Sequence, residues 1–309
     1  MRVAIMGSGG LGGFYGGLLA RAGEDVTFIA RGAHLEAIRG RGLTVKSQMM
    51  GDFSVSAPAT DDPGTLAPVE LVLVGVKTYD LDAAGEQMRP LVGPETVVLP
   101  LQNGIDATDR LARAVGAGRV IAGVAYVASF VEAPGVIKHT AMNRILLGEP
   151  NGGPSPRVER IANMLRGAGI VCETPTEIRV SLWEKLIVLA GTGGVMALTR
   201  LPVGPLRDCA EAAALFRGAM EEAAAVGRAC GVPLAEGIVN QHWDMILGLP
   251  PAAHGSMLQD LKMGRRLEVE SLNGTVIRLG REMGIPTPLN FAVYAGLKAY
   301  AEGPPAMAV

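Results

Sequence analysis

The chain has 309 residues, of which 49% are apolar, and its formal net charge is −2 at pH 7. This length is sufficient for two domains, each with its own core. The nearly balanced charge leaves no broad basic surface for nucleic acid or anionic lipid, and 4% aromatic residues provide few platforms for stacked bases. We therefore expect a protein that acts on a small molecule and has no nucleic-acid partner.

The cysteines and histidines are scattered, without CxxC or metal-ligand spacing. We therefore expect no metal site, reduced thiols as in a cytoplasmic protein, and structural or surface roles for the cysteines and most of the histidines. A run of glycines near the N-terminus argues against a signal peptide. The apolar run after Lys185 is shorter than the ~18 residues of a membrane span, so no membrane partner is expected. The residues concerned are Cys172, Cys209, Cys230, His34, His139, His242 and His254.

The first half of the chain alternates apolar, strand-like segments with helical ones. Strands that are apolar along their whole length and alternate with helices indicate a parallel sheet covered on both faces. The segments "GVIKHT" and "RILLGE" are expected to add two strands in antiparallel pairing. The expected strands are residues 2–6, 25–30, 70–76, 96–101, 119–128, 135–140 and 144–149, and the expected helices are residues 11–23, 81–91 and 107–115.

From about Ile178 the pattern changes to helical periodicity, for example over residues 211–230 and 264–284. The fold class expected is therefore α/β plus all-α. A Rossmann-type domain over residues 1–176 precedes a helical substrate and catalytic domain over residues 177–309. Clefts between two such domains are common small-molecule sites, and the apolar faces of the helical half make a homodimer plausible.

The segment "GSGGLG" matches the GxGxxG pattern directly after the first predicted strand and at the start of the first helix. In this pattern the first glycine permits a tight turn, the second lets a pyrophosphate approach the backbone, and the third allows close packing of helix on strand. The helix N-terminus offers free N–H groups to phosphates. The segment predicts a dinucleotide site at Gly7, Ser8, Gly9, Gly10, Leu11 and Gly12.

The end of the second predicted strand indicates which dinucleotide is bound. NAD-binding proteins place an acidic residue there, which holds the ribose 2′-hydroxyl. This chain has Arg31 in that place and no acidic residue until Glu36. A guanidinium pairs well with a 2′-phosphate, so NADP(H) is favoured as the cofactor, with a solvated surface arginine as the alternative.

Two polar residues follow the next two strands of the predicted parallel sheet. Lys77 comes just after the strand over residues 70–76, and Asn103 just after the strand over residues 96–101. Ligands bind at the carboxyl ends of strands in open α/β sheets. This shared placement favours contact with the cofactor over the alternatives of an exposed lysine and an ordinary Asn-Gly turn.

Taken together, these motifs resemble a known family. The chain is similar, over essentially its whole length, to the ketopantoate reductases (2-dehydropantoate 2-reductases). The motifs, in order, are "GSGGLG", Arg31, "VKTYD", "QNG", "LWEKL", "SMLQD" and "LEVESLNG". The resemblance implies NADPH-dependent reduction of a 2-keto acid, nominally ketopantoate to pantoate in pantothenate biosynthesis.

The resemblance also implies roles for individual residues, of which the central one is Lys185 as proton donor and substrate contact. Hydride transfer to a ketone builds negative charge on its oxygen, which an ammonium group stabilises and protonates. Partial burial lowers the pKa of a lysine toward neutrality and so suits it to this work. The other implied contacts are Asn103 and Ser256 for substrate, and Lys77, Asn103, Ser129 and Glu268 for cofactor, with Asn273 and Gly274 completing the segment of Glu268.

The chain departs from the family pattern at three positions. Leu189, Gly193 and Val203 stand where the family carries asparagines that hold ketopantoate. Without these asparagines that part of the pocket is more apolar and roomier. A site that binds a substrate hydroxyl discriminates strongly against substrates that lack it, so loss of the asparagines should change substrate preference. A paralogue that reduces a different keto acid is therefore one interpretation. Recognition of ketopantoate through a rearranged pocket, with Thr192, Thr199 or Arg200, is the other.

Two further classes stay open from the residues alone. A different nicotinamide dehydrogenase, for a 3-hydroxy acid or an opine, shares the two-domain plan, but Lys185, Ser256 and Glu268 in their family order argue against it. A non-catalytic NADP(H)-binding sensor has no need of a proton donor, so Lys185 argues against that class as well.

Overall fold

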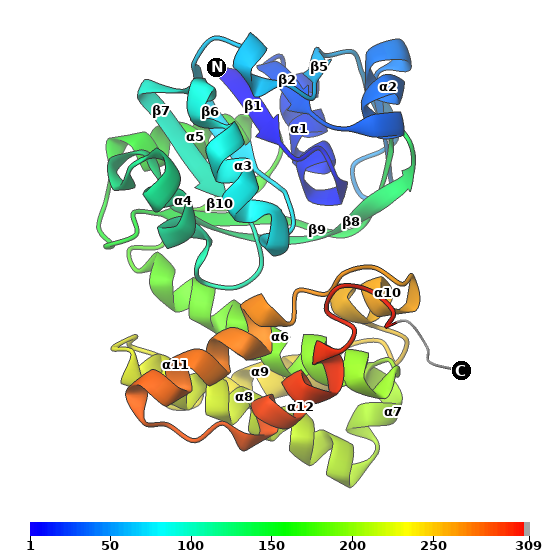
Figure 1. The fold of residues 1–309 in the computed structure, drawn as a ribbon, viewed down its shortest axis with the longest axis vertical. Helices are drawn as coiled ribbons and strands as arrows, with labels where there is room; N and C mark the ends of the chain where they lie inside the picture. Colours follow the sequence, from blue (N-terminus) through cyan, green and yellow to red (C-terminus); the bar gives the residue numbers. More distant parts are fainter. Residues whose placement is uncertain (306–309) are drawn as a thin grey trace. The chain divides into compact units, whose positions relative to one another are not determined.

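The structure, a computed structural model, describes residues 1–305 (Figure 1). Its internal contacts divide the chain into two compact units. Unit 1 comprises Met1–Gln102 and Asp106–Arg179, and unit 2 comprises Asn103–Ile105 and the chain from Val180 onward. The boundary between two domains at residues 176 and 177 stays a prediction.

Unit 1 is built on a parallel sheet of strand order β5-β2-β1-β6-β7. Residues of β1 alternate between two apolar clusters: Val3 and Ile5 belong to one, and Ala4 and Met6 to the other. Both faces of the sheet are therefore buried, and the predicted Rossmann-type fold is confirmed. The strands are β1 (Arg2–Met6), β2 (Asp25–Ile29), β5 (Ala59–Thr60), β6 (Val69–Val74) and β7 (Val92–Pro100), and the helices of the unit are α1 (Gly10–Arg21), α2 (Gly32–Arg41), α3 (Leu81–Gln87), α4 (Ala107–Val115) and α5 (Pro156–Gly167).

A second sheet of order β10-β9-β3-β4, with β8 paired to β9, also lies in unit 1. The prediction that residues 119–128 join the parallel sheet was wrong. Only a single bridge links Val120 to Val98, after which β8 (Ala122–Ala133) pairs antiparallel with β9 (Val136–Gly148). An apolar pattern indicates a strand but does not select its partner. The remaining strands are β3 (Leu43–Ser47), β4 (Phe53–Val55) and β10 (Val171–Glu173), none of which was predicted.

The prediction of two strands at residues 135–140 and 144–149 was wrong, because they form one strand, β9. This strand pairs antiparallel with β8, as expected, but parallel with β3 and β10. The register with β8 shifts at Val127, and Met142 within β9 has a φ of 61°. This irregularity interrupts the alternation of side chains, which is why the sequence resembles two strands.

Unit 2 is helical, as predicted, and its helices enclose one apolar cluster. The long helix expected over residues 264–284 is shorter: α11 begins at Thr275 and is preceded by a π-helical turn, Glu270–Gly274. The helices are α6 (Ile178–Thr199), α7 (Val203–Arg207), α8 (Ala210–Ala229), α9 (Ile238–Leu247), α10 (Ser256–Lys262), α11 (Thr275–Met283) and α12 (Pro288–Lys298).

Helix α6 is longer than the apolar run that the sequence suggested. By length and composition alone it could cross a membrane, but 67% of its apolar window is buried inside the protein. Its glycines allow close packing. A Cβ at Gly191 would lie 2.9 Å from Met220 Cγ of α8, and one at Gly194 would lie 2.6 Å from Asn273 Oδ1. The apolar face of α6 therefore serves the core of unit 2.

Candidate functional site

The glycines of "GSGGLG" have the geometry that a dinucleotide loop requires. Gly7 has a φ of +94°, and a Cβ there would lie 2.8 Å from the backbone N of Val76. A Cβ at Gly12 would collide with the carbonyl O of Gly7. At Gly9, in contrast, a Cβ would meet no described atom within 4 Å, so the space beside it is open. Gly7 and Gly12 are required by the fold itself, and Gly9 is the glycine that leaves room for a ligand.

The start of α1 fits an anion. Gly9 is the N-cap, no side chain caps the helix, and its first turn carries no acidic residue. The N-terminal N–H groups therefore have no capping side chain to satisfy them and lie at the positive end of the helix dipole. A pyrophosphate suits both features.

Ser129 on β8 lies against this loop. A Cβ at Gly10 would collide with the backbone O of Ser129, so strand and loop are in direct contact. Among the described residues, the buried Ser129 Oγ has no hydrogen-bond partner. A buried hydroxyl without a partner is costly, and a bound polar ligand would satisfy it. The role of Ser129 as a cofactor contact stays a prediction.

The other two predicted cofactor contacts of unit 1 follow their strands as expected. Arg31 is the exposed N-cap residue of α2, and its Nη2 donates to Gln87 Oε1 at 2.8 Å. Lys77 is half-buried and precedes the short 3₁₀ turn Thr78–Asp80 after β6. Arg31 retains further N–H donors in its guanidinium fork.

In unit 2, three segments distant in sequence meet around Lys185. Glu268 is 6% exposed, and its Oε2 accepts a hydrogen bond of 3.4 Å from Asn103 Nδ2. Lys185 is half-buried on α6. Burial of its ammonium group lowers the pKa of Lys185 to about 8. The nearby Glu268 carboxylate has the smaller, opposite effect of raising this pKa. The structure thus brings Asn103, Lys185 and Glu268 together. The sequence predicts Lys185 at the head of the first helix of the C-terminal domain, but it lies seven residues after the start of α6.

A buried amide network holds the turn that follows Glu268. Asn273 Nδ2 donates to the carbonyl O of Ala190 on α6 at 3.0 Å and to Asn290 Oδ1 at 2.9 Å. Asn290 in turn donates to Glu222 on α8. Asn273 and Asn290 are both fully buried, and buried amides that bond in this way fix the spacing of the helices that they join. Sequence reasoning missed Asn290 and Glu222, because nothing in their local pattern indicates this network.

Ser256, the predicted substrate contact, is exposed and is the first residue of α10.

The three departures from the family pattern occupy different environments. Leu189 is half-buried. A Cβ at Gly193 would lie 3.3 Å from Met257 Cε and 3.5 Å from Leu272 Cδ1, so its surroundings are apolar. Val203 is 1% exposed and belongs to the core of unit 2.

The polar residues considered as replacements are already bonded within unit 2. Thr192 Oγ1 donates to Val188 O, and Thr199 Oγ1 donates to Val195 O, each one turn back along α6. The guanidinium of Arg200 lies 5.7 Å from the centre of the Tyr300 ring. These contacts give no support to a rearranged polar pocket built from the three residues.

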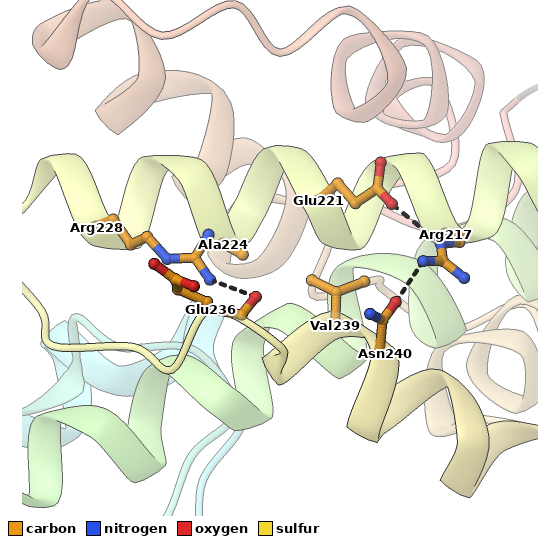
Figure 2. Close-up of a pocket in the computed structure, with 7 residues that line it drawn as sticks. All are labelled: Arg217, Glu221, Ala224, Arg228, Glu236, Val239 and Asn240. Carbon is orange, nitrogen blue, oxygen red and sulfur yellow. Dashed lines mark hydrogen bonds and ion pairs between the residues drawn. The ribbon is translucent and has the colours of Figure 1, made fainter.

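A cavity of about 230 Å³ lies between α8 and α9, and Figure 2 shows its lining. Its two arginines are already engaged. Arg217 donates to Glu221 and Asn240, and Arg228 donates to backbone carbonyls at Ala235 and Glu236. It contains none of the predicted site residues. Within residues 1–305 no group of three or more His, Cys, Asp or Glu side chains could hold a metal ion.

Strand, glycine turn and helix follow one another at the start of unit 1 as they do in Rossmann-type oxidoreductases, and a helical unit completes the architecture of that class. Residues 3–152 match the family described as ketopantoate reductase PanE/ApbA, and residues 177–301 match its C-terminal domain. The chain therefore belongs to the ketopantoate reductase family.

Similar proteins cover almost the whole chain. The 2-dehydropantoate 2-reductase of Mesorhizobium japonicum is 33% identical, over 97% of this chain and 98% of that protein. The solved 2-dehydropantoate 2-reductase of Geobacter metallireducens is 36% identical, with a TM-score of 0.90 over 96% of this chain and 99% of that one. A PanE/ApbA family ketopantoate reductase from Ralstonia eutropha is 35% identical, with a TM-score of 0.90 over 97% and 98% of the two chains.

Proposed function

We propose that this protein reduces a 2-keto acid to a 2-hydroxy acid with NADPH, nominally ketopantoate to pantoate in pantothenate biosynthesis. The observation that carries the proposal is the environment of Lys185: it lies beside Glu268, and burial lowers its pKa to about 8. The chain also belongs to a family of ketone reductases. A lysine with a pKa near neutrality is protonated at pH 7 and yet releases its proton readily.

The chemistry assigned to the chain follows from that lysine. The bound nicotinamide supplies the hydride. As the carbonyl carbon gains it, the ketone oxygen becomes negative, and the ammonium of Lys185 stabilises that charge and donates the proton. The Glu268 carboxylate keeps the lysine charged until then, and the hydrogen bond from Asn103 orients that carboxylate.

The cofactor assignment rests on unit 1. The loop from Gly7 to Gly12 and the uncapped start of α1 would hold the pyrophosphate, and Ser129 Oγ and Lys77 would add contacts. Arg31 would pair with the 2′-phosphate, which favours NADPH over NADH. Glu268 and Asn103 of unit 2 are assigned as the remaining cofactor contacts.

The choice of keto acid has two supported candidates. The relatives named as 2-dehydropantoate 2-reductases support ketopantoate. The apolar surroundings of Gly193, together with Leu189, support a keto acid with an apolar chain, because a hydroxyl left unpaired on burial costs about 1–3 kcal/mol. Ser256 is assigned as a substrate contact in either case. We further propose a cytoplasmic enzyme, compatible with a homodimer.

Oxidation of NADPH in the presence of a panel of 2-keto acids tests the function. Turnover of any member is expected, and it would rule out the sensor alternative. The ranking of kcat/KM identifies the substrate class: preference for acids that lack the 4-hydroxyl indicates a paralogue. Ketopantoate preferred over every apolar analogue would instead show that Leu189 and Gly193 do not decide specificity.

Substitution at Leu189 sharpens that ranking. Leu189→Asn restores the amide of the family pattern and should shift the ratio of kcat/KM toward ketopantoate by roughly 2- to 10-fold, the worth of one hydrogen bond. Leu189→Ala is the matched control, because it removes the leucine without adding a polar group. Equal shifts in both variants would assign the effect to lost bulk and contradict the role of the amide.

A further inference from the structure

His34 in the first turn of α2 joins two backbone segments of unit 1. Its Nδ1 accepts a hydrogen bond of 3.0 Å from the N–H of Gly135, and its Nε2 lies 2.8 Å from the carbonyl O of Ser8. A backbone N–H can only donate and a carbonyl O can only accept. The imidazole must therefore be the neutral tautomer that carries its proton on Nε2. Burial lowers the pKa of His34 and outweighs the hydrogen bond to Ser8, which raises it, so the neutral form is favoured.

The Gly135 side of this link is rigid. Gly135 lies between β8 and β9 with a φ of +77°, and its carbonyl O accepts from the N–H of Thr44 at 2.9 Å. A Cβ at this position would lie 2.9 Å from Ala37 Cβ of α2. Both the N–H and the C=O of Gly135 are thus hydrogen-bonded, so the backbone to which His34 bonds is held in place.

The Ser8 side lies inside the glycine-rich loop. The N–H and the Oγ of Ser8 both donate to the carbonyl O of Ile29, at 3.1 and 3.0 Å. The C=O of Ser8 belongs to the next peptide, Ser8–Gly9, and it accepts a hydrogen bond from His34. Because a trans peptide is planar, the direction of the Ser8 C=O also fixes the direction of the Gly9 N–H. Glycine resists such rotation less than other residues do, so this peptide needs an external restraint.

We propose that His34 is a positioning residue for the dinucleotide loop, which it holds by bonding the Ser8–Gly9 peptide to the β8–β9 turn. The proposal rests on the proposed function, in which this loop receives the pyrophosphate of the cofactor. Since the pyrophosphate is common to NADPH and NADH, loss of the restraint weakens both equally. This distinguishes His34 from Arg31, which is assigned to the 2′-phosphate alone.

The test compares His34→Leu with His34→Gln in the full-length protein. Leucine removes both hydrogen bonds, whereas the glutamine amide can donate to Ser8 and accept from Gly135. His34→Leu should raise the Kd of NADPH and of NADH by the same factor, about 3- to 10-fold, and His34→Gln should restore most of the affinity. The KM of the keto acid should not change. Arg41→Ala is the control, because Arg41 Nη2 also fastens the β8–β9 turn, at Pro134 O, without touching the loop.

The outcomes separate the two proposals. If the unmodified protein binds neither dinucleotide, the proposed function fails. The role of His34 is overturned if the unmodified protein binds both dinucleotides but His34→Leu changes neither Kd. It is also overturned if Arg41→Ala weakens the binding of both dinucleotides as much as His34→Leu does. Nitrogen NMR of the unmodified protein provides a second measurement, should His34→Leu fail to fold. A proton on Nε2 supports the link, and a proton on Nδ1 contradicts it.

Discussion

The glycine-rich loop of unit 1, which is proposed to hold the dinucleotide, and the lysine site of unit 2 are built in opposite ways. The loop consists of six consecutive residues, and it offers backbone N–H groups and empty space beside Gly9. The lysine site consists of side chains, from Asn103, Lys185 and Glu268, which are far apart in sequence. A backbone site depends on local conformation, whereas a side-chain site depends on how distant segments pack. Substitutions in the loop should therefore affect dinucleotide binding, and substitution of Lys185 should affect the chemical step.

The largest effect is expected at the lysine site. Lys185→Ala should lower kcat by ~10²–10⁴-fold, because the proton donor and the stabilising charge are lost together. The Kd of NADPH, measured by fluorescence titration, should barely change. Lys262→Ala, the same substitution on an exposed lysine of α10, is the control and should leave kcat unaltered. Survival of most activity in Lys185→Ala would place the proton donor elsewhere.

The loop should show the reverse behaviour. Gly9→Val should raise the Kd of NADPH and NADH by about 10- to 100-fold, because the side chain fills the space beside the phosphate contacts and hydrogen bonds to charged groups are lost. Its Tm should fall by only a few degrees, since no described atom lies within 4 Å of the new Cβ. Gly12→Val, which collides with Gly7 O, should instead lower Tm strongly. Unimpaired dinucleotide binding by Gly9→Val would contradict the assignment of the loop.

Cofactor preference is a smaller effect within unit 1. Arg31→Ala should weaken NADPH by roughly 3- to 10-fold and leave NADH unchanged, because an exposed charge-assisted contact to the 2′-phosphate is lost. Arg39→Ala on the same helix, where the guanidinium pairs with Glu36 and Asp61, is the control. Equal affinity of the unmodified protein for NADPH and NADH would refute the assignment.

The smallest effect concerns pH. Lys185 must be protonated to donate, so kcat at saturating NADPH should be constant below its pKa of about 8 and fall as pH rises through that value. The Glu268 carboxylate raises this pKa, so Glu268→Gln should move the fall in kcat to lower pH. A pH profile that Glu268→Gln leaves unchanged, or moves upward, would show that the two side chains do not interact.

Much of the fold could be predicted from the sequence, because its signals are local. Strands β1, β2, β6 and β7 of unit 1 and the helical character of unit 2 follow from runs of apolar residues and their period, whereas the two-residue strand β5 was not predicted. The pairing of the second sheet could not be predicted, although the segments that form β8 and β9 were predicted as strands. Its strand β8 reads like any other apolar strand, and only its pairing with β9 across many residues decides that it leaves the parallel sheet.

The candidate site divides in the same way. The sequence by itself determined the glycine loop and Arg31, because a turn and its flanking strand and helix are encoded within some thirty adjacent residues. Lys185 stands out in the sequence as a lysine at the head of an uncharged apolar run, but only the family resemblance favoured a catalytic role over a structural one. The tertiary structure decided that Asn103 bonds Glu268, that Val203 lies in the core, and that His34 bonds Ser8. The physical reason is that burial, pKa and hydrogen bonding are set by neighbours in space, and residues far apart along the chain become neighbours only through packing.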